Sequence, residues 1–275
     1  MDLTFYGVRG SCPCPSEHNL RYGGNTACVA LTAEGENPII FDLGTGLRAF
    51  GDTQPLDGSF AGTALVTHIH WDHVQGLPFF PPADRTGARL SIYGPQQDEG
   101  SLGELIDDFM RPPYFPVKVG ELRGEYTFHE VLKDEVRIGA AEVTVRPVPH
   151  VGPTVGYRVR WHDRVVTYIS DHQAPLDLES IGEPVLELAD SADVLIHDAQ
   201  YTPDEFAEKS HWGHCTIDYA IRVAREAKVQ TLVLFHHDPG HADDRMDEIL
   251  ADARAASGPR GPEILAAYEG LRIRL

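Results

Sequence analysis

The sequence predicts an α/β protein with β-sheets in the middle and helices outside. Short runs rich in β-branched and aromatic residues fill the first half of the chain, and helical segments alternate with strands in the second half. No linker-like stretch separates the two halves, so we predict a single domain over residues 1–275. A chain of 275 residues can bury a sizeable core without disulfides.

Strands dominate the first part of the chain, because Gly, Pro, Asn and Asp separate its apolar runs as strand boundaries require. The predicted strands are 3–8, 27–33, 38–44, 62–68, 89–94, 126–131, 135–138 and 141–148. The runs 154–161 and 164–170 predict a hairpin around His162-Asp163, and the Pro-rich, aromatic stretch 111–120 predicts a loop.

Helices and strands alternate towards the C-terminal end. Thr216 can cap the N-terminus of a helix whose apolar residues recur at helical spacing. The other helices are predicted at 99–110, 176–190 and 242–256, and the remaining strands at 193–199, 229–237 and 263–274.

The charge balance is strongly acidic. Asp and Glu number 42 against 23 Lys and Arg, a formal net charge of −19, which counts against binding driven by phosphate-backbone contacts. No run of 18 apolar residues is present, and the start MDLTFYGVRG does not resemble a secretory signal. We therefore expect a cytoplasmic protein with no membrane partner.

The four cysteines are Cys12, Cys14, Cys28 and Cys215, too few and too scattered for a disulfide scaffold. Cys12 and Cys14 could form a metal or redox pair, but no second such pair completes it. Reduced loop cysteines are the preferred interpretation.

The segment THIHWDH at 67–73 carries the main chemical signal. His68, His70 and Asp72 are spaced by two, so in an extended segment they point the same way, whereas His73 points elsewhere. Imidazoles together with a carboxylate suit borderline divalent metals such as zinc. A single histidine would indicate a solvated polar loop, but this density directly after an apolar strand favours metal ligands.

Further candidate ligands follow other apolar strands. His150, Asp171 and either His236 or His237 each come at the end of such a run, so they would stand at the rim of a sheet. Each alone could be an ordinary polar residue at a strand end. Strand alternation allows only one of His236 and His237 to face the site, without deciding which.

Taken in chain order, these residues resemble the metallo-β-lactamase superfamily, from Phe41-Asp42-Leu43-Gly44 to the last histidine. The resemblance implies a four-layer αβ/βα sandwich with two central mixed β-sheets and a binuclear metal site at their edge. It implies that one metal binds His68, His70 and His150, that the second binds Asp72, His73 and the last histidine, and that Asp171 bridges both.

Three later segments are similar to those of tRNase Z-like enzymes, namely LIHDA at 195–199, GHCT at 213–216 and LVLFH at 232–236. The third segment makes His236 the ligand rather than His237. The stretch NLRYGGN at 19–25 departs from the tRNase Z pattern, and the Gly/Pro-rich arm that grips tRNA has no visible counterpart. Together with the acidic charge, this makes tRNA an unlikely substrate and favours the bacterial phosphodiesterases of the same branch.

The resemblance implies a binuclear metal-dependent phosphodiesterase that hydrolyses a small phosphodiester, above all a cyclic nucleotide, by attack of a metal-bridging hydroxide. Zinc is the first choice for both ions, with manganese or iron as alternatives. Asp72 is a candidate catalytic residue near the water, and His214 is the candidate general acid for a ribose leaving group. The alternatives are a tRNase Z-like ribonuclease, a lactonase or thioesterase, and a metal-binding module without catalysis.

Several residues are expected around this centre. Asp198 and Asp42 could orient histidines or serve in turns. Arg21 and Asn25 are candidate substrate contacts at the phosphate, and Trp71 is expected to pack beneath the metal motif. The aromatic stretches 77–80 and 114–116 either line a base-binding lip or cover the core. Aromatic loops and the resemblance also make a homodimer plausible.

Overall fold

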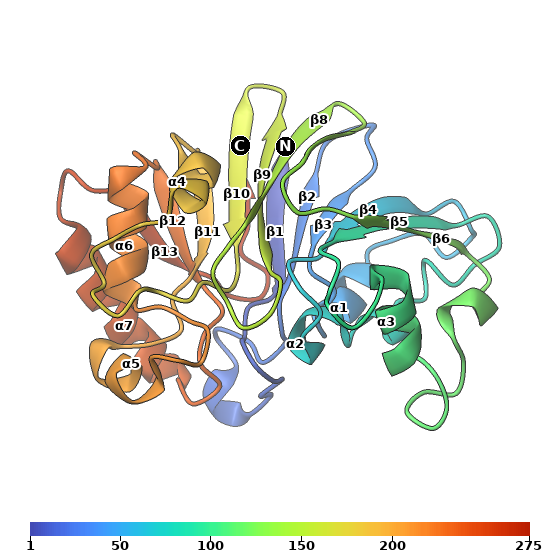
Figure 1. The fold of residues 1–275 in the computed structure, drawn as a ribbon, viewed down its shortest axis with the longest axis horizontal. Helices are drawn as coiled ribbons and strands as arrows, with labels where there is room; N and C mark the ends of the chain where they lie inside the picture. The colour runs from blue at the N-terminus through green and yellow to red at the C-terminus, as the bar shows by residue number, and fades with distance from the viewer.

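The computed structural model describes residues 1–275 as two seven-stranded sheets packed against each other, with helices on their outer faces (Figure 1). The strand order is β14-β1-β2-β3-β4-β5-β6 in the first sheet and β13-β12-β11-β10-β9-β8-β7 in the second. Each sheet contains parallel and antiparallel pairs. This architecture confirms the predicted α/β class and the four-layer αβ/βα sandwich with two central mixed β-sheets.

The first sheet is built from the N-terminal half of the chain and its last strand. Its strands are β1 (Asp2–Gly7), β2 (Cys28–Thr32), β3 (Ile39–Phe41), β4 (Ala61–Leu65), β5 (Arg89–Gly94), β6 (Glu125–Glu130) and β14 (Arg272–Arg274). Its helices are α1 (Leu47–Gly51), α2 (Trp71–Val74) and α3 (Leu102–Phe109).

The second sheet is built from the C-terminal half. Its strands are β7 (Glu135–Ile138), β8 (Ala141–Pro147), β9 (Val155–Trp161), β10 (Arg164–Ile169), β11 (Val194–Asp198), β12 (Thr231–Phe235) and β13 (Glu263–Ala266). Its helices are α4 (Glu183–Ala189), α5 (Pro203–Lys209), α6 (Ile217–Glu226) and α7 (Asp243–Ser257).

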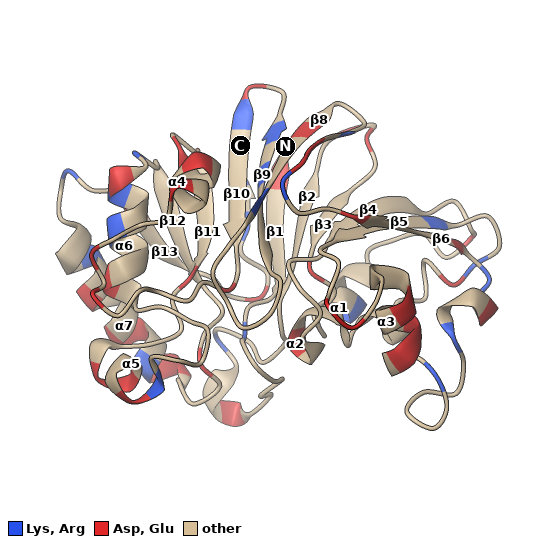
Figure 2. Cartoon of the chain, viewed as in Figure 1, with Lys and Arg blue, Asp and Glu red and all other residues tan.

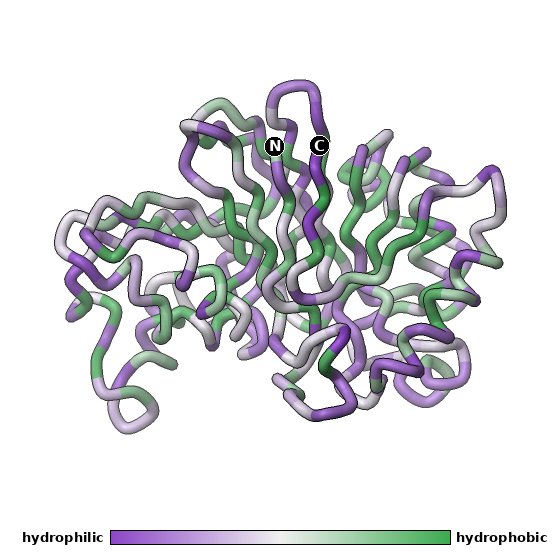
Figure 3. Tube along the Cα trace, turned by 180° about the vertical axis from the view of Figure 1, so that it is seen from behind, coloured by the Kyte–Doolittle hydropathy of each residue, from purple (hydrophilic) through white to green (hydrophobic).

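A buried apolar layer fills the space between the two sheets, and Figure 3 shows hydrophobic residues along the central strands of both. The rings of Phe41 and Tyr168 stack across it with centroids 4.9 Å apart, and those of Phe5 and Phe235 lie 6.1 Å apart. The two halves of the chain therefore share a core. A single domain over residues 1–275 stays a prediction, with which this shared layer is compatible.

The predicted strand over 263–274 is wrong as a single element. The chain leaves the second sheet after Ala266, turns at Gly270, whose φ is +90°, and pairs Arg274 with Asp2 in the first sheet. Sequence pattern marks extended segments but not the sheet to which each belongs, because sheet pairing depends on contacts that are distant in sequence.

The helix boundaries in the structure differ from the predicted ones for local reasons. The helix predicted over 176–190 begins only at Glu183, because Gly182 is its N-cap and Pro184 occupies its first turn. Helix α5 was not predicted, although Thr202 and Glu205 form a capping box that marks its start. Helix α1 was also missed, since its five residues are too few for a periodic signal.

The topology brings several strand ends to the same edge of the sandwich. Strands β10, β11 and β12 are parallel neighbours, so their carboxyl ends lie together, and α2 follows β4 at the same lower edge in Figure 1. Candidate ligands come after β4, β10 and β12, and His150 follows β8. No helix of the structure is both long enough and apolar enough to span a membrane.

Candidate metal centre

The candidate ligands of the motif after β4 face two different directions. The chain stays extended through His70 and then enters α2 at Trp71. His68 and His70 therefore face His150. Asp72 and His73 lie on the first turn of α2 and face His236. The expectation that His68, His70 and Asp72 all point the same way is wrong, because strand alternation ends where the helix begins.

Five overlapping groups of residues could hold a metal ion, and two of them together contain all the candidate ligands of the motif. We call His68, His70 and His150 the first ligand group, and Asp72, His73 and His236 the second. In the first group, His70 Nδ1 lies 2.8 Å from His68 Nε2 and 3.4 Å from His150 Nε2. In the second, Asp72 Oδ2 lies 3.1 Å from the Nε2 atoms of both His73 and His236.

Asp171 lies between the two groups. Its Oδ2 is 3.2 Å from His73 Nε2 and its Oδ1 is 3.5 Å from His236 Nε2, on the side of the second group. On the side of the first group, Oδ1 lies 3.9 Å from His68 Nε2 and 3.8 Å from His150 Nε2. One carboxylate at the end of β10 therefore reaches both groups.

The outer nitrogens of these histidines have their own acceptors. His73 Nδ1 donates to Asp42 Oδ2 at 2.7 Å, and His150 Nδ1 donates to the carbonyl oxygen of Gly213 at 2.6 Å. His236 Nδ1 donates to Gln200 Oε1 at 2.8 Å. Each acceptor fixes the tautomer that leaves Nε2 unprotonated and directed inward, as a metal-binding histidine requires.

Asp42 is held in place from several sides. Its carboxylate accepts hydrogen bonds from Thr67 N at 2.8 Å and from Tyr168 Oη at 2.8 Å, in addition to His73. Asp42 is fully buried and has a φ of +56°, which is rare outside glycine. The structure thus places Asp42 against a candidate ligand, as the sequence suggested.

The backbone at the end of β12 selects His236 over His237. His236 has a φ of +59°, which turns its ring into the cluster, and a Cβ at Gly10 would lie 2.4 Å from His236 Nδ1. The ring of His237 instead donates from Nε2 to the carbonyl oxygen of Ala267 at 2.9 Å. Burial lowers the pKa of His237 to about 3, so this residue stays neutral in its structural role.

The electrostatics match a site for cations. Burial opposes the charge of Asp171, but the surrounding imidazoles, led by His236 and His73, hold the pKa of its carboxyl well below its usual range. Burial holds the pKa of His68 well below its ordinary value, which keeps that imidazole neutral. The buried atoms His73 Nε2 and Asp171 Oδ2 have no hydrogen-bond partner. With the proton of His73 on Nδ1, these two atoms are both acceptors, and buried acceptors that face one another fit a divalent metal ion.

His214 joins the cluster from the segment before α6. Its Nδ1 donates to Asp198 Oδ2 at 2.9 Å, and its ring centroid lies 5.0 Å from that of His236. Asp198 also accepts from the backbone N–H groups of His172 and Gln200, both at 3.0 Å. The carboxylate at the end of β11 is therefore rigid and orients the His214 ring.

Arg21 and Asn25 have other partners. The Arg21 guanidinium pairs with Asp244 and Asp247 at the start of α7, and Asn25 Nδ2 donates to Glu269 Oε2 at 3.1 Å. These side chains tie the 19–25 loop to the C-terminal part of the chain. Their contacts give no support to a role at the phosphate.

Trp71 does not pack beneath the motif, and that expectation is wrong. Its side chain is 76% exposed, because the first residue of α2 faces outward when Asp72 and His73 face inward. The stretch 77–80 is mixed, since Leu77 and Phe80 are buried in the core whereas Phe79 is exposed.

Sequence reasoning missed several residues that support the site. Gln200 holds His236, and Ser11 N donates to Asp72 Oδ2 at 2.8 Å. Buried Arg9 donates to the carbonyl oxygens of Gly23 and His241 and so braces the loops beside the cluster. No local motif marks these residues, because each acts on a partner that is distant in sequence.

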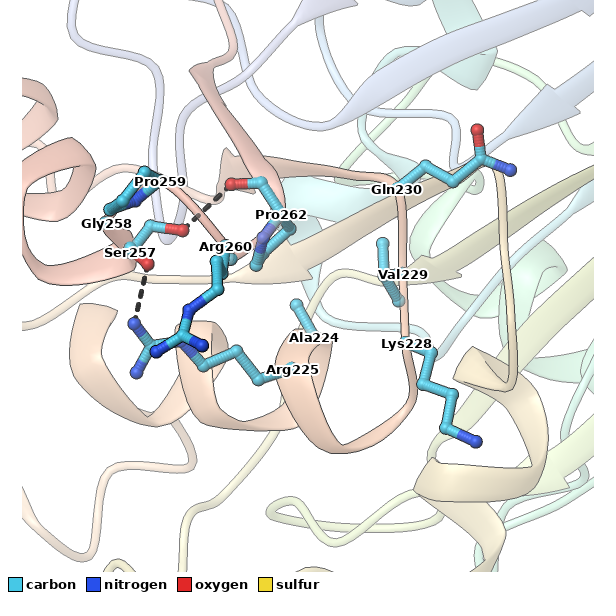
Figure 4. Close-up of a pocket in the computed structure, with 11 residues that line it drawn as sticks. Ala224, Arg225, Lys228, Val229, Gln230, Ser257, Gly258, Pro259, Arg260 and Pro262 are labelled. Carbon is cyan, nitrogen blue, oxygen red and sulfur yellow. Dashed lines mark hydrogen bonds between the residues drawn. The ribbon is translucent and has the colours of Figure 1, made fainter.

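A hollow of about 710 Å³ lies away from the candidate ligands (Figure 4). It is bounded by the ends of α6 and α7 and by Gln230, just before β12, whereas His236 follows the other end of that strand. Its Arg225 donates to the carbonyl oxygens of Ala256 and Ser257 and thereby caps α7. Arg225 therefore serves the fold rather than the metal centre.

Comparisons with known proteins agree with this geometry. Residues 39–237 match the family model described as the beta-lactamase superfamily domain. A protein from Haloarcula marismortui named ribonuclease Z is 27% identical, with 100% of this chain and 97% of that protein covered. The structure of human tRNase Z, short form, has a TM-score of 0.72 at 22% identity and covers 100% and 99% of the two chains. Yeast PDE1 has a TM-score of 0.69 at 15% identity, over 100% and 99%.

These relatives contradict the expectation that tRNA is an unlikely substrate. A protein named ribonuclease Z matches this chain over nearly its full length, so the acidic charge and the missing counterpart of the arm were not sufficient grounds for setting tRNA aside. The physical reason is that net charge describes the whole surface. Figure 2 shows many of the acidic residues on the outer helices α3, α5, α6 and α7.

Histidines and carboxylates face inward at one edge of two mixed sheets. Residues 39–237 also match the family model of the beta-lactamase superfamily domain. The chain belongs to the β-lactamase superfamily domain family and is a metal-dependent hydrolase with the metallo-β-lactamase fold.

Proposed function

We propose that this hydrolase is a phosphodiesterase with two divalent metal ions, and that RNA is its first candidate substrate. The observation that carries the proposal is the His214–Asp198 pair beside the ligand cluster, with its hydrogen bond of 2.9 Å. A buried imidazole held by a carboxylate suits proton donation to the poor leaving group of a phosphodiester. The names of the relatives, ribonuclease Z and tRNase Z, support RNA.

The two ligand groups would each hold one ion, with Asp171 shared between them. The first group has three histidines, and the second has two histidines and a carboxylate. Such a nitrogen-rich set suits zinc, with manganese or iron as alternatives. Bound divalent ions would supply an activated water near neutral pH and neutralise charge on the phosphoryl oxygens.

Asp72 would orient the attacking water. Its Oδ2 is fixed by the Ser11 N–H at 2.8 Å and lies between the rings of His73 and His236. The two imidazoles keep the pKa of Asp72 well below its usual range despite its burial, so it stays an acceptor. A fixed carboxylate acceptor in the cluster can hold a proton of the water in line for attack.

His214 would protonate the leaving oxygen, with Asp198 as its positioning residue. Because Nδ1–H donates to Asp198, the free ring nitrogen Nε2 is the one that can carry the transferred proton. A ribose alkoxide is a strong base, so this proton transfer would contribute about 10²–10⁴-fold to the rate.

A small phosphodiester such as a cyclic nucleotide is the second candidate substrate. It is favoured by the exposure of His70, which a single nucleotide could approach from solvent. Lactones and thioesters are the remaining class that this fold could serve.

A substrate panel tests the proposal. Purified protein loaded with Zn²⁺ or Mn²⁺ would be given a tRNA precursor with a 3′ trailer, then 2′,3′- and 3′,5′-cyclic nucleotides, with chelated protein as the blank. We expect metal-dependent cleavage of at least one phosphodiester. Turnover of lactones or thioesters alone, or cleavage that survives chelation, would contradict a metal-dependent phosphodiesterase.

A further inference from the structure

An apolar hollow of about 640 Å³ opens directly beside the metal-binding motif. Ile69, Trp71 and Gln75 form one wall, from the motif and α2. The opposite wall includes Phe109 at the end of α3, followed by Arg111 and Tyr114 from the loop behind it. Nothing assigned so far to the metal centre uses these side chains.

The hollow and the ligand cluster share one stretch of backbone. Ile69 lies between His68 and His70 in the chain, and Trp71 lies between His70 and Asp72, so ligands and wall residues alternate. His70 is also the one exposed ligand of the first ligand group. Consecutive Cα atoms are about 3.8 Å apart, so the wall of the hollow begins one residue from the exposed ligand His70.

The exposed aromatic rings are unusual for a surface with no partner. Trp71 and Tyr114 are each 76% exposed, although both line the same hollow. Large exposed apolar residues that gather at a concave surface mark binding sites. Indole and phenol rings are flat surfaces on which a nucleobase stacks, whatever its identity.

Polar side chains lie at the rim of the hollow and carry hydrogen-bond donors and acceptors. Arg111 Nε donates to Asp108 Oδ1 at 2.9 Å, which fixes the guanidinium at the rim of the hollow. Gln75 brings an amide whose Nε2 donates to Thr26 Oγ1 at 3.5 Å. An apolar floor with such groups at its edge matches a nucleobase, which has a π-face and a hydrogen-bonding edge, better than an acyl chain.

We propose that this hollow binds the nucleobase next to the scissile phosphodiester, with Trp71 as its stacking platform. The inference rests on the proposed function and narrows the substrates to base-bearing phosphodiesters. It makes Trp71 a substrate-binding residue placed between two metal ligands, although it coordinates nothing itself.

Binding and hydrolysis are measured separately with Trp71→Ala and Trp71→Phe, and with Leu56→Ala as a control for loss of an exposed apolar side chain elsewhere. The binding probe is adenosine monophosphate, titrated into metal-loaded protein by calorimetry. We expect Trp71→Ala to weaken binding by about 10- to 100-fold and Trp71→Phe to retain most of it, since stacking needs only an aromatic face. Metal content, measured on each variant, should be unchanged.

The hydrolysis arm compares the dinucleotide ApA with an analogue that lacks the base beside the cleaved bond. Trp71→Ala should lower kcat/KM about 10- to 100-fold on ApA and leave the abasic analogue nearly unaffected. If the wild type binds adenosine monophosphate through Trp71 but cleaves no phosphodiester, the proposed function fails and the base site stands.

Three results would overturn the base site itself. One is a wild type that does not bind adenosine monophosphate. The second is equal binding by the wild type and Trp71→Ala. The third is self-association in sedimentation that Trp71→Ala abolishes without changing nucleotide affinity, which would assign the hollow to a second copy of the chain.

Discussion

The Asp171→Ala variant should lose phosphodiesterase activity by a factor on the order of 10³ or more. Asp171 is the one carboxylate within 4.0 Å of ring nitrogens from both ligand groups, namely those of His68, His150, His73 and His236. Its removal takes away the one carboxylate that both ligand groups share. The measurements are kcat on the best substrate of the panel and metal content per chain by elemental analysis.

A matched control separates this effect from a general loss of negative charge. Asp163 is an exposed carboxylate in the turn between β9 and β10, so Asp163→Ala should keep both activity and metal. A near-normal rate in Asp171→Ala, in protein that still unfolds cooperatively, would contradict a shared ligand between two metal ions.

The His214→Ala variant should lose about 10²–10⁴-fold in kcat on a substrate with a ribose leaving group. The same change should cost little on a phosphodiester that releases 4-nitrophenolate, because that leaving group needs no proton. His214 Nδ1 is fixed by Asp198, so Asp198→Asn should show a weaker form of the same selectivity. The readout is the ratio of kcat values on the two substrates for each variant.

The ratio of kcat values on the two substrates distinguishes a general acid from a metal ligand at position 214. His214 also lies within ligand distance of His150 and Asp171, so it could instead contribute to the metal centre. Equal losses on both substrates, together with a lower metal content, would show that His214 binds metal and would rule out its role as general acid.

That the candidate ligands lie together was predictable because their signals are local. The HxHxDH motif needs only residues 68–73, and His150, Asp171 and His236 each follow an apolar run that marks a strand end. Parallel strands place such ends at a common edge, which is why separated segments could be assigned to one site. Which residues share a group was not predictable from spacing alone, because helix α2 begins inside the motif.

The residues around the ligands were harder to predict, because their contacts bridge distant parts of the chain. Gln200 meets His236 only when β11 and β12 lie side by side, and Asp42 meets His73 only through the order of β3 and β4. Arg21 could not be recognised as a partner of α7 from its own loop. Trp71 was expected to pack beneath the motif because it lies inside it, and only the start of α2 shows that it faces outward.

Titration of metal into chelated protein, with cleavage of the best phosphodiester followed throughout, tests the central claim most directly. The account predicts no cleavage without metal and a rate that rises until about two equivalents per chain are bound, since the two ligand groups each hold one ion. Full cleavage by the metal-free chain, or metal binding that brings no phosphodiester cleavage, would contradict it.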